Sequence, residues 1–125
     1  MKHLHIAAFL LTLLTGVASI AHAASEKGWF GFGLTVEADG LFFNPTLRVV
    51  KINSVVPSSP AASAGLLVGD LVLEVQGILV AGSKANTLKA ASRRSVGETL
   101  RIKVKSGAAE PYELSIIAIA KPSGV

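Results

Sequence analysis

Short apolar or alternating stretches, separated by turn residues, predict five or six strands along the chain. Leu34–Glu37 alternates with a period of two, which is typical of a half-buried strand. Residues 100–105 alternate aliphatic with basic side chains and indicate a strand with one face in water. The expected strands are residues 34–37, 46–56, 71–75, 78–80, 100–105 and 112–120. The chain is therefore expected to be built mainly from a sheet.

Two segments carry signals of helix ends. Ser59 is placed to cap a short helix, and Gly65 suits the left-handed residue at which such a helix ends. A second helix is expected over about residues 84–94, with Ser83 as its cap. Together with the strands, these helices predict an α+β fold, a partly open barrel or sandwich of five to six strands with two helices.

An apolar Leu-Phe-Phe run lies within residues 38–45, between the turn dipeptides Asp39-Gly40 and Asn44-Pro45. Exposed aromatic patches are uncommon on monomeric proteins. We therefore expect Phe42 and Phe43 to fold back as a clip onto the core, and a hydrophobic lid is the alternative.

The first 23 residues have the features of a signal peptide. Lys2 supplies positive charge, residues 6–20 are almost entirely apolar, and Ala21-His22-Ala23 fits the small-x-small rule for signal peptidase. We expect cleavage after Ala23, export to a periplasm or out of the cell, and no stable membrane insertion afterwards. An uncleaved N-terminal anchor is the alternative, although a bilayer span needs roughly 20 apolar residues.

The charged residues and the absence of cysteine narrow the classes of function. The chain has 12 basic and 8 acidic residues, and cleavage would remove only Lys2 from this count. This mild positive balance does not favour a nucleic-acid partner. All three histidines lie within residues 1–23, so the mature chain could build neither a Ser–His–Asp nor a Cys–His arrangement. We expect no enzyme activity, no cofactor and no metal site.

A Ser–Lys pair is the nucleophile arrangement that the mature chain could still offer, at Ser83-Lys84 and at Lys105-Ser106. Sequence neighbours on a strand point to opposite sides of the sheet, and neither lysine is expected to be buried. Both serines are better interpreted as turn residues.

The run Gly31-Phe32-Gly33-Leu34 stands at the entry to the first strand. Two glycines around an aromatic residue predict a tightly bent backbone that directs several N–H groups into one concavity, which can hold an anion. A dinucleotide-binding loop is not favoured, because Val36 stands where that motif has its third glycine and the run leads into a strand instead of a helix.

This run resembles the carboxylate-binding loop of PDZ domains, often written Gly-Leu-Gly-Phe. The segments 59–66 and 69–77 resemble the Ser-Pro-Ala-x-x-Ala-Gly-Leu and Gly-Asp-x-Ile…Asn-Gly signature of bacterial PDZ domains, with Gln76 where asparagine is usual. The resemblance implies a PDZ domain over residues 28–120. A flexible arm at residues 24–27 would precede it, and a frayed tail at residues 121–125 would follow it. The arrangement is similar to the permuted type found in exported proteases, in which the last strand, here residues 112–120, takes the place of a strand before the loop.

The resemblance also implies how a ligand would bind. A peptide would add as a strand beside Leu34–Glu37, and the backbone amides of Phe32, Gly33 and Leu34 would hold its terminal carboxylate, with Gly31 shaping the loop. The implied groove consists of Phe32, Leu34, Val36, Asn86, Ala90 and Arg94. A register slip of one residue would substitute Thr87 and Ala91 on the helix side.

The function implied is that of a non-enzymatic module standing alone. It would capture C-terminal or exposed β-strand segments of other proteins of the cell envelope, with a micromolar dissociation constant. One alternative is an accessory subunit that regulates a separate protease or secretion machine or delivers substrate to it. Another is a purely structural interaction domain with a degenerate groove.

Overall fold

The computed structural model describes residues 26–40 and 42–125, and the expected cleavage site after Ala23 lies outside these residues. The elements are, in chain order, β1 (Phe32–Asp39), β2 (Thr46–Val55), α1 (Pro60–Ala64), β3 (Leu71–Val75), β4 (Ile78–Leu79), α2 (Ala85–Ser92), β5 (Thr99–Lys105) and β6 (Tyr112–Ile117). The prediction of an α+β fold with two helices is confirmed. Within the described ranges, no helix is long and apolar enough to cross a membrane.

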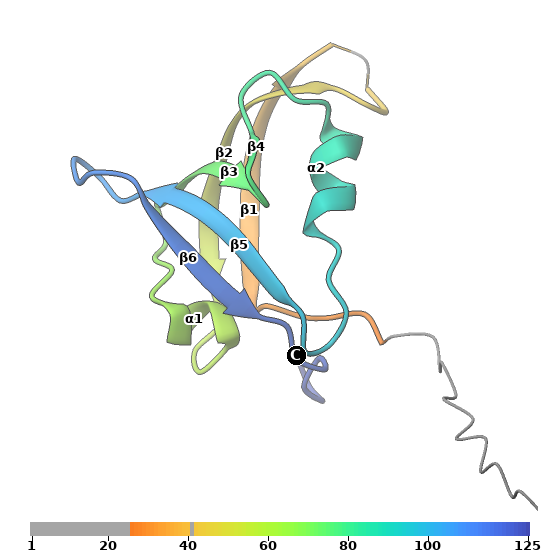
Figure 1. The fold of residues 1–125 in the computed structure, drawn as a ribbon, viewed down its shortest axis with the longest axis vertical. Coiled ribbons are helices and arrows are strands. Elements are labelled where there is room, and N and C mark those ends of the chain that lie inside the picture. Colours follow the sequence, from red (N-terminus) through yellow and green to blue (C-terminus); the bar gives the residue numbers. More distant parts are fainter. Residues whose placement is uncertain (1–25, 41) are drawn as a thin grey trace, which may run out of the picture.

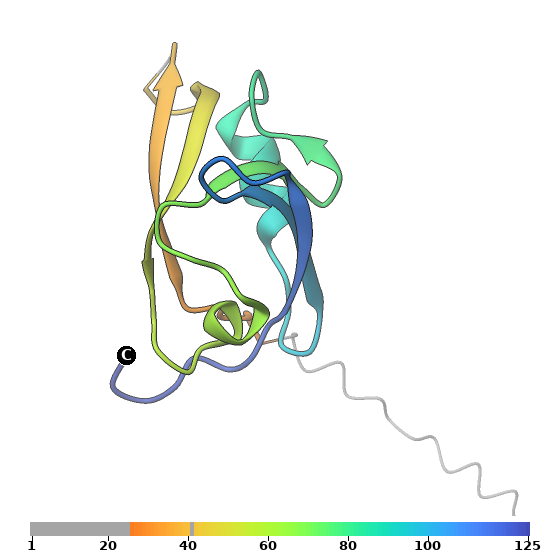
Figure 2. The ribbon, with the colours of Figure 1, turned by 90° about the vertical axis from the view of Figure 1, so that its left-hand side faces the viewer.

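The strands form one antiparallel sheet in the order β1-β2-β3-β5-β6, and the short β4 pairs with β3. β2 and β3 share a single residue pair, Lys51 with Leu71, so the sheet separates there into two wings. Figures 1 and 2 show β1 and β2 in one wing and β5 and β6 in the other, with α1 near one end between them. The sheet is not closed, because its path ends at β1 and at β6.

The core lies between the two wings. Ile52 of β2, Leu100 and Val104 of β5, and Ile116 of β6 are at most 1% exposed. On β5 the aliphatic side chains alternate with more exposed basic and polar ones, as the period of two predicts. This buried layer is the rigid support on which β1 and α2 are held.

α1 begins and ends where the sequence predicts. Ser59 Oγ accepts a hydrogen bond from the N–H of Ala62 at 3.2 Å, and Gly65 has a φ of 92° at the end of the helix. The N–H of Ala61 donates to the carbonyl of Phe30 at 3.0 Å. The first turn of α1 is therefore tied to the segment that enters β1.

The start of α2 differs from the expectation, because Ser83 is not its cap. Ser83 Oγ donates to the carbonyl of Leu79 at 2.6 Å, and the capping position is taken by Lys84, which makes no side-chain cap hydrogen bond. Instead, Asn44 Oδ1 accepts a hydrogen bond from the N–H of Asn86 at 3.0 Å. The helix is thus capped from the loop between β1 and β2.

The prediction that Phe42 and Phe43 clip onto the core is wrong. Phe42 is 98% exposed and Phe43 is 75% exposed. The β1–β2 pairing continues to Asp39 and Thr46, and Asp39 forms an ion pair with Arg48 at 2.8 Å. Because the hairpin is paired to its end, the loop is too short to bring the two rings back to the core.

The C-terminal strand lies beside the segment that precedes β1, as the permuted arrangement implied. β6 pairs with β5 along its length. Beyond it, Trp29 and Ile119 exchange backbone hydrogen bonds at 2.8 and 3.1 Å. Trp29 is therefore held by a residue near the end of the chain, just before the backbone turns into β1.

Candidate functional site

Gly31 forms the bend that the glycine run predicts. It is buried and has a φ of 85°, and its carbonyl accepts a hydrogen bond from the N–H of Val56 at 2.7 Å. A Cβ at this position would overlap the side chain of Ser59, which is itself 2% exposed. Glycine is required here both for the backbone conformation and for the close approach to α1.

Gly33 has a different role from the one expected, because it is not in the left-handed region. It lies in β1 next to an irregularity in the pairing with β2, where the register shifts between Gly33 and Leu34. A Cβ at Gly33 would meet the side chains of Asn53 and Ser54. The prediction of two bent glycines is thus correct for Gly31 and wrong for Gly33, which is small because two neighbouring side chains occupy the space.

A cavity of about 390 Å³ opens beside the glycine loop, and we call it the loop-end cavity. Its apolar lining consists of Phe30, Phe32, Leu34 and Leu100. Four basic residues also line it, namely Lys27, Lys89, Arg93 and Arg94. An apolar lining beside a cluster of cations suits a group that combines an apolar side chain with a negative charge.

A second cavity, of about 320 Å³, lies between β1 and α2, and we call it the β1–α2 groove. Leu34 and Val36 line it from β1 and are 45% and 47% exposed. Leu34, Lys89 and Ser92 line both this groove and the loop-end cavity, so the two are continuous. Among the described strands, β1 pairs only with β2, which leaves its other edge free for a further strand.

The helix side of the groove differs in register from the expectation. Ala85, Leu88, Lys89 and Ser92 line the groove, whereas Asn86, Thr87 and Ala90 are exposed and line neither cavity. Ala91 also lines neither cavity, and it is half-buried against the core. The expected helix continued to about residue 94. α2 ends at Ser92, because Arg93 has an extended ψ of 113°, so Arg94 does not continue the helical phase of the residues before it.

The other expected site residues lie together. Phe32 and Leu34 line the loop-end cavity, Val36 lines the groove, and Arg94 lines the loop-end cavity beside the glycine loop. Nothing in the structure tests whether the amides of Phe32, Gly33 and Leu34 hold a carboxylate, which stays a prediction.

Sequence reasoning missed the wall opposite the glycine loop, which residues 26–28 form with residues 94–96. Gly28 donates its N–H to the carbonyl of Arg94 at 2.8 Å, and the N–H of Val96 donates to the carbonyl of Glu26 at 2.9 Å. A Cβ at Gly28 would overlap Ala118. Glu26 and Lys27 belong to the expected arm, and their backbone pairing places Lys27 at the rim of the loop-end cavity.

A tight turn from Ser95 to Glu98 supports this wall. The N–H of Ser95 donates to Glu98 Oε1 at 2.6 Å, and the N–H of Glu98 donates to the carbonyl of Ser95 at 2.9 Å. The hydrogen bond from the backbone N–H of Ser95 lowers the pKa of Glu98 below its ordinary value of 4.5. The carboxylate is therefore stabilised in its charged form.

The buried carboxylate of Asp70 holds a turn outside both cavities. It is 2% exposed, Ser106 Oγ donates to its Oδ1 at 2.5 Å, and the N–H of Leu67 donates to its Oδ2 at 3.0 Å. Ser106 is thus engaged in a structural hydrogen bond, as the turn interpretation of the Lys105-Ser106 pair expected. Residues 26–40 and 42–125 contain no group of three or more His, Asp or Glu side chains that could hold a metal ion.

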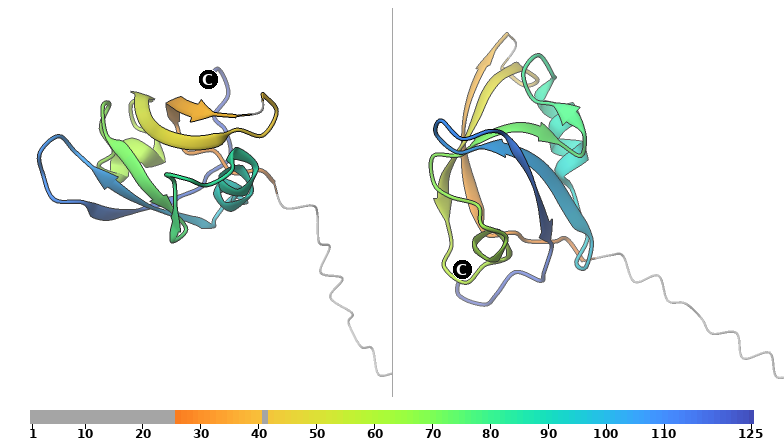
Figure 3. Two further views of the ribbon diagram at one scale, coloured as in Figure 1. Left: turned by 90° about the horizontal axis from the view of Figure 1, so that it is seen from above. Right: turned by 60° about the vertical axis from the view of Figure 1, so that its left-hand side comes forward.

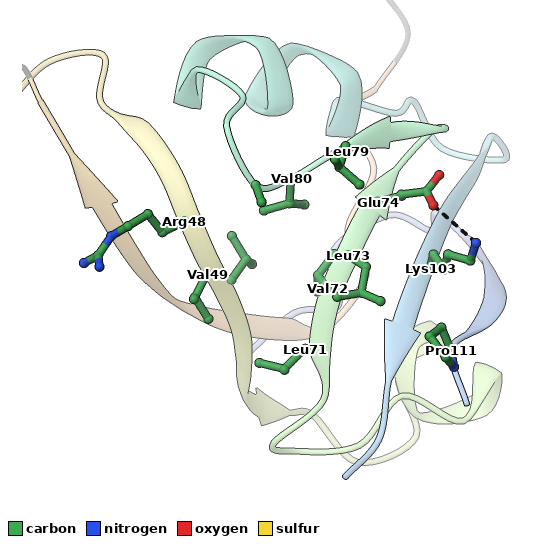
Figure 4. Close-up of a pocket in the computed structure, with 12 residues that line it drawn as sticks. Arg48, Val49, Leu71, Val72, Leu73, Glu74, Leu79, Val80, Lys103 and Pro111 are labelled. Carbon is green, nitrogen blue, oxygen red and sulfur yellow. Dashed lines mark ion pairs between the residues drawn. The ribbon is translucent and has the colours of Figure 1, made fainter. Parts of the chain in front are cut away.

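A third cavity, of about 270 Å³, lies where β2 and β3 diverge. Figure 4 shows its lining side chains and the ion pair between Glu74 and Lys103, whose charged atoms are 3.3 Å apart. Val50 and Val80 line both this cavity and the β1–α2 groove and separate the two. None of the expected site residues lines this third cavity.

Comparisons with solved structures find the same fold in parts of proteases. The chain is similar to an HtrA-type protease AlgW with decapeptide (TM-score 0.57, 20% identity, 77% of this chain and 30% of that one). It is similar to a photosystem II D1 C-terminal processing protease (TM-score 0.57, 20% identity, 79% of this chain and 24% of that one). A third similar structure is the PDZ domain of a carboxy-terminal protease from Vibrio cholerae in complex with peptide (TM-score 0.55, 22% identity, 76% of this chain and 95% of that one). The chain thus matches less than a third of the length of the first two proteases but nearly all of the isolated domain.

A comparison of the sequence with curated proteins found no match. Residues 28–112, in contrast, match the family described as PDZ domain. This segment includes the glycine loop, both helices, β1 to β5 and, apart from Lys27, every residue that lines the two cavities beside the loop. Since it makes up more than half of the chain, the protein belongs to the PDZ domain family.

Proposed function

We propose that this chain binds the C-terminal segments of partner proteins by strand addition to β1. The observation that carries the proposal is the position of β1 at the edge of the sheet, with its free edge beside an apolar groove that continues into the loop-end cavity. An extended peptide bound there would gain backbone hydrogen bonds from β1 and bury alternate side chains against α2.

The two ends of the groove differ, which gives the bound peptide a direction. The terminal carboxylate would lie at the amides of Phe32, Gly33 and Leu34, close to the basic side chains that line the loop-end cavity. The last side chain would enter the apolar lining formed by Phe30, Phe32, Leu34 and Leu100. The peptide would then lie antiparallel to β1, with its upstream residues extending toward Pro45 and the start of α2.

The expected affinity is modest. Hydrogen bonds to a charged group contribute roughly 1.5 to 3 kcal/mol each, and burial of one apolar side chain contributes about as much. The loss of translational and rotational freedom offsets several kcal/mol of this gain. A dissociation constant in the micromolar range is therefore expected, which corresponds to a binding free energy of about −8 kcal/mol.

The test compares one peptide in two chemical forms. The probe is the tightest binder panned from a library of random C-terminal peptides, labelled with a fluorophore and synthesised with a free or an amidated C-terminus. Wild-type protein is expected to bind the free acid at least about tenfold more tightly, since amidation removes the charged acceptor. Equal binding of the two forms would contradict carboxylate recognition.

A pair of protein variants tests the position of the site. Leu34→Glu puts a negative charge between the two cavities, and Ile117→Glu makes the same change at an exposed position of β6. The first substitution is expected to abolish binding of the free acid, and the second is expected to leave it unchanged. Loss of binding in both variants, or in neither, would contradict the groove as the binding site.

The proposed setting is the cell envelope, where the partners would be C-termini or segments of other exported proteins. This part of the proposal is supported by the charge of Lys2, the apolar residues 6–20 and the Ala21-His22-Ala23 pattern. Mass spectrometry of the protein purified from its native cell is expected to find a chain that starts at Ala24. An intact chain in the membrane fraction would support the uncleaved anchor instead.

A further inference from the structure

The two phenylalanines at the tip of the β1–β2 hairpin are the most exposed large apolar side chains of the described residues. Phe42 is 98% exposed and Phe43 is 75% exposed, in a loop that projects beyond the sheet in Figures 1 and 3. Exposing two adjacent aromatic rings to water is unfavourable. We therefore expect a binding partner to cover them.

The tip does not move freely with respect to the groove, because backbone and side-chain hydrogen bonds tie it to α2. The N–H of Ala85 donates to the carbonyl of Pro45 at 2.8 Å, and the N–H of Asn86 donates to Asn44 Oδ1 at 3.0 Å. Thr46 also forms a backbone bridge with Lys84. The segment 44–46, which directly follows Phe43, is therefore held next to the start of α2.

The tip lies close in the chain to the end of the β1–α2 groove. Pro45 lines the groove together with Val36 and Ala85, and Phe43 is only two residues before Pro45 in the chain. β1 runs from the glycine loop at Phe32 to Asp39 at the base of the tip. Since one residue of a strand spans about 3.3 Å, a peptide antiparallel to β1 would reach the tip roughly six to eight residues before its C-terminus.

We propose that Phe42 and Phe43 form a second anchor for the bound peptide, which selects partners with apolar side chains upstream of their C-terminus. This inference rests on the proposed function, because it assumes a peptide along β1. The ligand is then an extended segment whose last residue fills the loop-end cavity and whose upstream apolar side chains pack on the two rings. A short C-terminal peptide would use only the first of these contacts.

The charges around the tip favour a peptide over a lipid surface as the occupant. Glu37 and Asp39 balance Arg48 and Lys84, and Asp39 and Arg48 are paired with each other. Apolar loops that insert into anionic membranes are typically accompanied by an excess of basic residues. In this protein the basic cluster lies at the other end of the groove, in the loop-end cavity.

The experiment measures the gain in affinity that upstream length provides. The probes are a panned peptide of about twelve residues with leucine at the sixth to eighth positions from its end, its last five residues alone, and the long peptide with serine in place of those leucines. The variant is Phe42→Ser with Phe43→Ser. The matched control is Leu67→Ser with Val68→Ser, an adjacent apolar pair that is 59% and 64% exposed and lines neither the groove nor the loop-end cavity.

Wild-type protein and the control are expected to bind the long leucine peptide about fivefold or more tightly than the other two probes, and the phenylalanine variant is expected to bind all three equally. The second anchor is overturned if the phenylalanine variant still binds the long leucine peptide more tightly than the other two probes, or if wild type does not. Either result would leave the groove as the proposed binding site. If no probe binds wild type, the proposed function itself fails, and the anchor with it. Binding to phosphatidylglycerol vesicles that only the phenylalanine variant loses, together with an unchanged length gain, would assign the tip to a membrane.

Discussion

Asn44 Oδ1 accepts a hydrogen bond from the backbone N–H of Asn86 at 3.0 Å, although the two residues are 42 positions apart in the chain. Asn44 lies in the loop after β1, and Asn86 lies in the first turn of α2. The bond satisfies a donor that the helix itself cannot satisfy, and it joins the two walls of the groove. The side chain of Asn44 therefore joins the hairpin to α2 at this end of the groove, together with the backbone bond from Ala85 to Pro45.

Replacing Asn44 by alanine is expected to lower the free energy of unfolding by about 1 kcal/mol, because the start of α2 loses its cap. Hydrogen exchange of the Asn86 amide is expected to become faster. Ser83→Ala serves as the control, since Ser83 bonds the carbonyl of Leu79 and does not cap the helix. The assignment of the cap would be contradicted if Ser83→Ala accelerated exchange at Asn86 and Asn44→Ala did not.

Gly31→Ala is expected to cost about 3 kcal/mol of unfolding free energy, the sum of left-handed strain and overlap with Ser59. Gly82→Ala is the matched control, since Gly82 has a φ of 88° against 85° for Gly31. In the described part of the chain, nothing lies within 4 Å of a Cβ at Gly82. The control should therefore cost only about 1 to 2 kcal/mol. Urea unfolding measures both losses. Equal losses of unfolding free energy in Gly31→Ala and Gly82→Ala would show that the overlap with Ser59 contributes nothing.

Gly33→Val is expected to weaken binding of the free-acid peptide by about tenfold or more and to leave most of the stability intact. The side chains that a Cβ would meet, Asn53 and Ser54, are exposed and can turn away. The β-branched side chain would then change the backbone beside Leu34, where the carboxylate is expected to bind. Calorimetric titration and thermal unfolding measure the two effects, and unchanged affinity would contradict the role of this loop.

Arg94→Gln is expected to weaken peptide binding severalfold at low salt, because Arg94 lines the loop-end cavity with three other cations. Raising the salt concentration from roughly 0.05 M to 0.5 M should weaken wild-type binding by a similar factor and should affect the variant less. Arg101→Gln is the control, since Arg101 is exposed on β5 and does not line this cavity. Salt-independent binding by wild type would show that the basic residues do not attract the ligand.

Glu98→Gln tests the turn that supports the loop-end cavity. The pKa of Glu98 is lowered from 4.5 in the folded chain, so its stabilising effect is present above that value and is lost as the pH falls through the lowered pKa. Wild type is therefore expected to be more stable than the variant at neutral pH, and the difference is expected to shrink in acid. Melting temperatures between neutral and acidic pH measure this difference. A difference in melting temperature that widens as the pH falls would contradict the stabilising role of the charged Glu98.

Local signals in the sequence predicted most of the fold correctly. Ser59 and Gly65 define α1 because a cap and a left-handed stop act within a few residues of their own positions. The alternation of aliphatic and basic residues placed the buried face of β5 in the same way. The glycine loop was also found, because a buried bend with positive φ at Gly31 needs glycine whatever surrounds it.

The features that were missed depend on residues far apart in the chain. Ser83 has the right chemistry for a cap, but Asn44 reaches the helix from another loop. Phe42 and Phe43 have the hydrophobicity of core residues, but the hairpin is paired to its end and holds them in water. Gly28 carries no local signal, because its need for a small residue comes from Ala118 and Arg94.

The amino-acid sequence by itself thus determined most of the strands, the ends of α1 and the bend at Gly31, since each follows from conformational preferences within a short stretch. The family was indicated separately, by the resemblance of three short segments to PDZ domains. Only the tertiary structure decided which face of α2 lines the groove, because the helix phase is set where α2 starts and stops, at contacts with Asn44 and at the extended Arg93. It likewise decided that the tip of the hairpin stays exposed beside the groove. Both outcomes depend on pairing between distant segments, which periodicity along one segment does not contain.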